Sequence, residues 1–174
     1  TVNAVTRDPT KLHFANERFN VFKGDLETGV GLERAVSGCR WVVSAVSSSR
    51  PSDCVAHLLK AVGTRWVDRL IFVSRADDTV PAHGLARLSS MVNRKQVAHE
   101  LSSAVDLLRV SGLPWLIIKT TGLTDETAGR QVVWGGEALP GKISRVELAR
   151  FILKALEQPE WNMRELNVGT HTGR

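Results

Sequence analysis

The chain has 174 residues, of which 43% are hydrophobic and 24% are charged, and its formal net charge is +5. A chain of this length usually forms one folded domain, so a single domain is expected over residues 1–174. The basic residues are dispersed, without a run of Lys or Arg or an aromatic stripe between them, which argues against a nucleic-acid interface. Attraction to a phosphorylated small molecule explains the positive charge as well.

Other classes of protein are excluded by what the chain lacks. No apolar run reaches the ~18–20 residues that cross a bilayer, and no signal-peptide pattern opens the sequence. The two cysteines, Cys39 and Cys54, are too few for a disulfide framework and lack the spacing of metal ligands. His99 and Glu100 begin like a zinc-protease motif, but no second histidine follows where it is needed. These features predict a cytoplasmic protein without metal or membrane association.

Strand-like and helix-like patterns alternate along the chain. The expected strands lie at residues 2–6, 19–25, 41–46, 70–73, 115–118 and 166–168. The expected helices lie at residues 31–36, from Ser52 or Asp53 to Gly63, at 85–110, and from a capping box at Ser144 to Pro159. The last helix is expected to turn Ile152, Leu153 and Leu156 inward. Strands that are apolar on both faces and followed by helices predict a doubly wound parallel sheet, an α/β fold.

In such folds ligands bind beyond the carboxyl ends of the strands. Arg7 follows the first expected strand, where its guanidinium could hold a ribose 2′-phosphate or simply face solvent. Asp25 and Leu26 follow the second strand and could flank an adenine ring, although a turn aspartate that caps the next helix is an equal interpretation. The small residues at the end of the third strand would let a cofactor approach closely, or form an ordinary serine-rich loop: Ser44, Ala45 and Val46.

Two further residues are candidates for a catalytic role. Ser74 ends the fourth strand and could bind a substrate or a nicotinamide, or be an ordinary strand-end serine. Met91 and Lys95 have the spacing of the Tyr-x-x-x-Lys pair that short-chain dehydrogenases use for proton transfer, but the chain contains no tyrosine. Lys95 could still reach the ribose of a nicotinamide nucleotide, although a lone helix lysine usually faces solvent.

Taken together, the chain resembles the atypical short-chain dehydrogenase/reductase group, in the NmrA-like or NAD(P)H-binding branch that includes biliverdin reductase B and flavin reductases. The matching segments run in order along nearly the whole chain and include Val5-Thr6-Arg7-Asp8-Pro9, Lys23-Gly24-Asp25-Leu26, Val42-Val43-Ser44-Ala45, Phe72-Val73-Ser74 and Ser144-Arg145-Val146-Glu147. The resemblance implies a Rossmann-like fold and a nucleotide, NADP or else NAD. It implies that the nucleotide contacts Arg7, Asp25, Leu26, Ser44, Ala45 and Val46, with Ser74, Lys95 and Thr120 on the nicotinamide side.

The chain departs from this group in three places. The first strand, glycine-rich turn and first helix of the group, about 25–30 residues, have no counterpart before Val2. That strand is central in the sheet, so its neighbours are expected to have unpaired edges unless something fills the gap. Either the sequence is an incomplete version of a longer protein, or another segment, a second copy or a partner protein completes the sheet. The other departures are Met91, in place of tyrosine, and Lys119-Thr120, in place of Arg-Pro.

The expected function is that of an NADP-dependent oxidoreductase that transfers hydride to a small carbonyl, quinone or flavin-like acceptor. Ser74 and Lys95 would be its catalytic residues, without a tyrosine acid. Met91 and the Lys119-Thr120 pair also motivate a second hypothesis, a non-catalytic NAD(P)-sensing or protein-interaction module. A third hypothesis is that the chain binds no dinucleotide.

Overall fold

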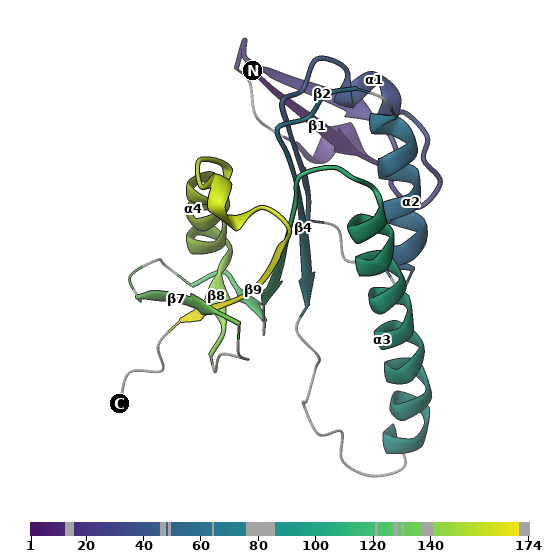
Figure 1. The fold of residues 1–174 in the computed structure, drawn as a ribbon, viewed down its shortest axis with the longest axis vertical. Coiled ribbons are helices and arrows are strands. Elements are labelled where there is room, and N and C mark those ends of the chain that lie inside the picture. Colours follow the sequence, from purple (N-terminus) through teal and green to yellow (C-terminus); the bar gives the residue numbers. More distant parts are fainter. Residues whose placement is uncertain are drawn as a thin grey trace.

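Strands and helices alternate along the chain in a computed structural model, which confirms the α/β prediction (Figure 1). The structure describes residues 1–12, 16–45, 48, 50–63, 65–75, 86–120, 122–126, 129, 131–136 and 141–170. The strands are β1 (Val2–Thr6), β2 (Phe19–Lys23), β3 (Trp41–Ser44), β4 (Arg69–Arg75), β5 (Trp115–Thr120), β6 (Leu123–Thr124), β7 (Val132–Gly135), β8 (Ile143–Ser144) and β9 (Arg164–Thr170). The helices are α1 (Leu32–Val36), α2 (Pro51–Val62), α3 (Ala86–Val110) and α4 (Arg145–Leu156), with short turns η1 (Pro9–Lys11) and η2 (Pro159–Trp161).

The strands pair in three groups. The main sheet has the order β3-β4-β5-β9-β7, in which only β7 runs antiparallel to its neighbour. Strands β1 and β2 form a separate parallel pair, and the two-residue strands β6 and β8 form another. Parallel neighbours joined through helices are the arrangement that the apolar strands predict.

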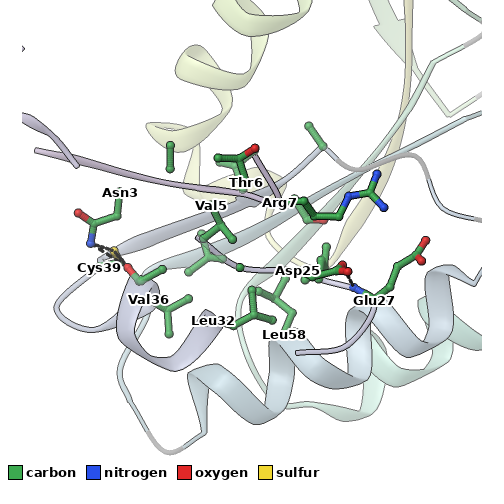
Figure 2. A pocket seen from close by; sticks show the side chains of 18 of the residues that line it. Asn3, Val5, Thr6, Arg7, Asp25, Glu27, Leu32, Val36, Cys39 and Leu58 are labelled. Carbon is green, nitrogen blue, oxygen red and sulfur yellow. Dashed lines mark hydrogen bonds between the residues drawn. The ribbon is translucent and has the colours of Figure 1, made fainter. Parts of the chain in front are cut away.

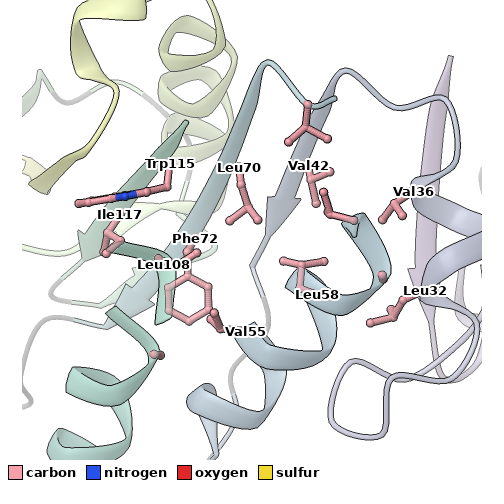
Figure 3. Packing of buried hydrophobic residues seen from close by; sticks show 14 of the residues in the cluster. Leu32, Val36, Val42, Val55, Leu58, Leu70, Phe72, Leu108, Trp115 and Ile117 are labelled. Atoms are coloured by element: carbon pink, nitrogen blue, oxygen red, sulfur yellow. The ribbon is translucent and has the colours of Figure 1, made fainter. Parts of the chain in front are cut away.

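Helices cover both faces of the main sheet. Helices α2 and α3 lie side by side on one face, and α4 lies on the other (Figure 1). Alternate residues of β5 reach opposite faces: Ile117 packs in the cluster with α2 and α3, while Leu116 and Ile118 pack with α4. Figure 3 shows the first cluster, in which Val55 and Leu58 of α2 lie close to the sheet residues. Strand β5 is therefore buried on both sides, as a fully apolar strand should be.

The predicted ends of the helices are partly confirmed. The capping box exists: Ser144 Oγ accepts the backbone N–H of Glu147 at 3.1 Å, and the Glu147 carboxylate accepts that of Ser144 at 3.3 Å. The prediction that Ser52 or Asp53 caps α2 is wrong, because this helix begins at Pro51. Proline has no backbone N–H to satisfy and its φ angle suits a first helical position.

The predicted inner face of α4 is confirmed for Ile152 and Leu156, which pack against the buried cluster on this side of the sheet, and is wrong for Leu153. Leu153 is 65% exposed, whereas Leu148, Phe151 and Ala155 are buried against the sheet. These three residues follow the spacing of one helical face, and Leu153 lies outside it. The prediction that Leu153 points inward is therefore wrong.

The expected gap in the sheet is present within the described residues. Strand β1 pairs only with β2, and β3 pairs only with β4. At the start of the strands, the Asn3 side chain connects the two sides of this gap: its Nδ2 donates to Ala35 O at 2.8 Å and to Cys39 Sγ at 3.6 Å. Since Asn3 lies near the start of β1 and Cys39 just before β3, the two strands begin at the same end of the molecule.

Candidate functional site

A cavity of about 520 Å³ lies between β1 and β3. It has two parts, which we call the trough and the mouth. The trough lies between the facing strands and is lined by Asn3, Ala4, Val5, Trp41, Val42 and Val43. The mouth lies at the carboxyl ends of the strands and is lined by Arg7, Asp25, Leu26, Glu27, Ser44 and Ala45. Figure 2 shows Arg7, Asp25 and Glu27 together at one end of the cavity and Asn3 with Cys39 at the other.

The floor of the cavity is apolar. Leu32 and Val36 of α1 and Leu58 of α2 line it, and all three belong to the buried cluster between these helices and the sheet. Figure 2 shows these side chains beside Val5 of β1. The helices thus close one side of the cavity with packed hydrocarbon, and polar groups lie mainly at its two ends.

Arg7 supplies the positive charge of the mouth. Its side chain is exposed, and it forms no ion pair or hydrogen bond with the described residues. A guanidinium without a carboxylate partner keeps its full set of donors for a ligand. Among the described residues, nothing competes with a ligand for the guanidinium of Arg7.

Asp25 lies in a tight turn that follows β2. Its Oδ1 accepts the backbone N–H of Glu27 at 2.9 Å, and α1 begins only after Gly31. Asp25 therefore stabilises its own turn and does not cap α1. A Cβ on the preceding Gly24 would lie 2.6 Å from Val30 O, so the close return of the chain requires glycine there.

Ser44 is buried at the end of β3 without a partner. Its side chain is 5% exposed, and its Oγ has no hydrogen-bond partner in the described part of the chain. A buried hydroxyl that makes no hydrogen bond costs about 1–3 kcal/mol of desolvation. Ser44 is also one of the residues that line the cavity, which makes it a candidate contact for a polar atom of a ligand.

Glu27 and Asn3 are polar residues of the cavity that the sequence analysis did not identify. Glu27 lines the mouth and its Oε1 accepts a hydrogen bond from Ser48 Oγ at 2.6 Å. Asn3 lines the trough through its position on β1. The only sequence signal for Glu27 is its place in the turn that follows β2. Asn3 gives none, because its hydrogen-bond partners lie 17 to 36 residues away in the sequence.

The structure brings five of the predicted site residues together and leaves others apart. Arg7, Asp25, Leu26, Ser44 and Ala45 all line the mouth. Ser74 and Thr120 are buried near the ends of β4 and β5 and do not line this cavity. Val46 lies outside the described residues, and Lys95 lies on α3 with a side chain that is not among those described.

Ser74 lies farther along the sheet than Ser44. Ser44 is paired with Phe72 of β4, so Ser74 is two residues closer to the carboxyl edge. Ser74 of β4 is paired with Lys119 of β5, and Thr120 is the next residue of β5. The mouth and these buried hydroxyl groups therefore lie along the same edge of the fold.

Lys119 is held by an ion pair. Its Nζ lies 2.7 Å from Glu165 Oε2, and Arg109 donates to Glu165 Oε1 at 2.6 Å. Burial alone would raise the pKa of Glu165, but the hydrogen bond and charge of Lys119, together with Arg109, outweigh it and hold the pKa below its ordinary value. Glu165 is thus a carboxylate at neutral pH and neutralises Lys119.

The described residues show few other reactive groups. Both cysteines are free, and burial raises the pKa of the Cys54 thiol, which disfavours the reactive thiolate. No three His, Cys, Asp or Glu side chains come together as metal ligands in the part of the chain that the structure describes. None of the helices described there is long and apolar enough to cross a membrane.

Comparison with known proteins places these features in context. The sequence profile of the NAD(P)H-binding family matches residues 1–159. No curated protein sequence is significantly similar to the chain.

Solved structures share the fold. A Rossmann-fold NAD(P)-binding family protein from Shigella flexneri is 21% identical, with a TM-score of 0.73 over 97% of this chain and 79% of that protein. A short-chain dehydrogenase/reductase from Veillonella parvula in complex with NADP is 22% identical, with a TM-score of 0.70 over 95% of this chain and 77% of that protein. ChuY, an anaerobilin reductase from Escherichia coli O157:H7, is 16% identical, with a TM-score of 0.71 over 90% of this chain and 78% of that protein. These similarities confirm the Rossmann-like fold.

Proposed function

Because the chain belongs to the NAD(P)H-binding family, we propose that it binds NADP at the mouth of the cavity and acts as an oxidoreductase. One observation carries the proposal: Arg7, Asp25 and Ser44, from three different strand ends, line a single cavity. Nucleotides bind beyond the carboxyl ends of the strands in folds of this kind. The finer assignment, an atypical short-chain dehydrogenase/reductase of the NmrA-like type, rests on the sequence resemblance.

The residues of the mouth suit the adenosine half of NADP. The free guanidinium of Arg7 would bind the 2′-phosphate, which an arginine can hold with two parallel hydrogen bonds. The Asp25 carboxylate and the Leu26 side chain would lie against the adenosine. The unpaired Ser44 Oγ would gain a partner, and the small side chain of Ala45 leaves room for close approach.

The nicotinamide half would lie toward β4 and β5, beside Ser74 and Thr120, with Lys95 as the third contact. NADP supplies a hydride when it is bound in its reduced form. The protein residues would hold the acceptor in line and exclude water, because the chain contains no tyrosine to act as the proton donor. We propose a small carbonyl, quinone or flavin-like acceptor, and the fold shared with an anaerobilin reductase supports a reductase activity.

Calorimetric titration with NADPH and NADH tests the nucleotide assignment. The Arg7→Ala variant should bind NADPH about 10- to 100-fold more weakly, the effect expected from losing hydrogen bonds to a charged group, and should bind NADH almost unchanged. Arg18→Ala is the matched control, because Arg18 is also exposed but lies before β2, at the opposite end of the strands. Equal losses for the two nucleotides, or no binding of either, would contradict the assignment.

A second function is favoured by the ion pair of Lys119. A lysine neutralised by Glu165 has little charge to offer a substrate, and Met91 stands in place of the tyrosine. A non-catalytic module that senses NAD(P) and binds a partner protein fits these two features. NADPH oxidation with a panel of quinones, flavins and carbonyls separates the two functions: a sensor would bind NADPH and show no turnover.

A further inference from the structure

A cluster of three aromatic rings lies on the face of the main sheet that α4 covers. Trp134 of β7 lies 5.6 Å from Phe151 of α4 and 5.8 Å from Trp161 of η2, measured between ring centroids. Phe151 and Trp161 stack with their centroids 5.4 Å apart, so the three rings form one contiguous group. Phe151 is buried, whereas Trp134 is 42% exposed although it contacts both of the other rings. The cluster therefore turns part of a large aromatic surface to solvent.

A cavity of about 580 Å³, which we call the α4 cavity, lies between β7 and α4 beside this cluster. Val132, Trp134 and Phe151 form its apolar wall. None of the described residues that line it also lines the cavity between β1 and β3, and Figure 1 shows β7 and α4 well away from β1 and β2. Its volume is in the range of small-molecule sites, about 300–1,000 Å³. The α4 cavity is therefore a candidate site separate from the proposed nucleotide site.

Two cations of α4 line this cavity one helical turn apart. Arg150 and Lys154 are separated by four positions, so their side chains lie on the same face of the helix. Arg150 is exposed and forms no ion pair or hydrogen bond with the described residues. Lys154 Nζ lies 4.4 Å from the centroid of a Trp134 ring and has no carboxylate partner in the described part of the chain. The attraction to the indole holds this ammonium beside the apolar wall, where its charge is available to an anion.

One carboxylate, that of Glu147 near the start of α4, also lines the cavity. It is buried, and its Oε1 accepts a hydrogen bond from Gly129 N at 2.9 Å while its Oε2 accepts one from Ser144 Oγ at 3.0 Å. The described residues that line the α4 cavity thus carry two positive charges and one negative charge. A ligand with a single negative charge balances them.

We propose that the α4 cavity is a binding site for a small aromatic acid, a planar ring system that carries one carboxylate. The ring would pack against Trp134 and Val132, since aromatic rings favour offset or edge-to-face contacts with one another. The carboxylate would accept two parallel hydrogen bonds from Arg150, and Lys154 would add a second positive charge. A nucleic acid fits less well, because the chain lacks the run of basic residues that would follow a phosphate backbone.

The test uses 2-naphthoate as the probe, added to the whole chain and followed by NMR through the indole N–H signals of the five tryptophans. The signal of Trp134, assigned with a Trp134→Phe variant, should shift in a saturable way as the acid binds. The neutral analogue 2-naphthamide has the same rings and nearly the same shape. It should bind about tenfold more weakly, because it offers no charge to Arg150.

Two variants of α4 test the role assigned to the arginine. Arg150→Gln should weaken the binding of 2-naphthoate about tenfold and leave that of 2-naphthamide unchanged. Arg145→Gln is the matched control, because Arg145 lies on the same helix but pairs with Asp125 and does not line the cavity. This control should bind 2-naphthoate as the unmodified chain does. Both arginines are exposed, so neither substitution should disturb the fold.

Four results would overturn the proposal. One is the absence of a saturable shift at Trp134. Another is equal affinity for the acid and the amide, which indicates apolar contact without recognition of charge. A third is an equal loss in the two arginine variants, because the net positive charge of the chain would then account for the attraction. The last is displacement of 2-naphthoate by NADPH, because the acid would then occupy the nucleotide site. A chain that binds no NADPH leaves the Trp134 result unaffected, so the two proposals fail independently.

Discussion

Strands β5 and β1 show how differently the two parts of the sheet are built. The first four residues of β5 are buried, with α2 and α3 on one face and α4 on the other. No residue of β1 is fully buried, and one of its edges faces a cavity. We infer that burial of side chains in the main sheet contributes most to the stability of the fold. The candidate site lies where the side chains are least buried.

The largest effect should come from the centre of the main sheet. Ile117→Ala removes a side chain that is 0% exposed and should reduce the free energy of unfolding by about 3–4 kcal/mol, through lost burial and an unfilled cavity. Val21→Ala on β2, which is 37% exposed, should cost less than about 1 kcal/mol. Urea unfolding measures both. Similar losses for the two variants would show that the β1–β2 pair contributes as much as the main sheet.

The next effect concerns the buried Arg69 at the start of β4. Its guanidinium donates to Ala155 O, to Gln158 O at 2.6 Å and to Asn162 Oδ1 at 2.6 Å, so it satisfies carbonyl groups at the end of α4. Arg69→Met should cost about 2–3 kcal/mol, because these acceptors would be left buried and unpaired. Thermal unfolding measures the loss.

Arg40→Met is the matched control for that variant. Arg40 pairs with Asp68 but its side chain is 71% exposed, so its removal should cost less than about 1 kcal/mol. An equal change for both arginines would mean that the contacts of Arg69 with α4 contribute little to stability.

The smallest effect depends on pH. The pKa of Glu165 is held below its ordinary value. Its ion pairs therefore stabilise the fold fully at a pH above the pKa that the Glu165 carboxyl has in the unfolded chain. This stability is lost as the pH falls through the lower pKa of Glu165 in the folded protein. Glu165→Gln should therefore cost about 1 kcal/mol at neutral pH and almost nothing in acid. Urea unfolding at a series of pH values measures the difference. A cost that does not change with pH would mean that packing, not charge, accounts for the effect.

The sequence predicts the main sheet well because its signals are local. The apolar run of β5, Gly63 at the end of α2 and the capping box at Ser144 each act within a few residues. Strands β6, β7 and β8 were not predicted, since each consists of two to four residues and pairs with a distant strand. The prediction for Leu153 of α4 failed for a related reason, because packing against the sheet, and not the helix sequence alone, decides which residues are covered.

The site was partly predictable. Arg7, Asp25 and Ser44 could be expected to converge because the carboxyl ends of parallel strands share one edge. Glu27 and Asn3 could not, because their roles come from contacts across the fold.

The side-chain amide of Asn3 attaches the β1–β2 pair to the rest of the fold. Besides its contacts with Ala35 and Cys39, its Oδ1 accepts a hydrogen bond from Asn20 Nδ2 at 3.0 Å, so one side chain joins both strands to the helical layer. At the other end of the pair, Glu27 Oε1 accepts a hydrogen bond from Ser48 Oγ. The β1–β2 pair is therefore attached to the rest of the fold at both ends of the cavity, and the space between these attachments is what a ligand can fill.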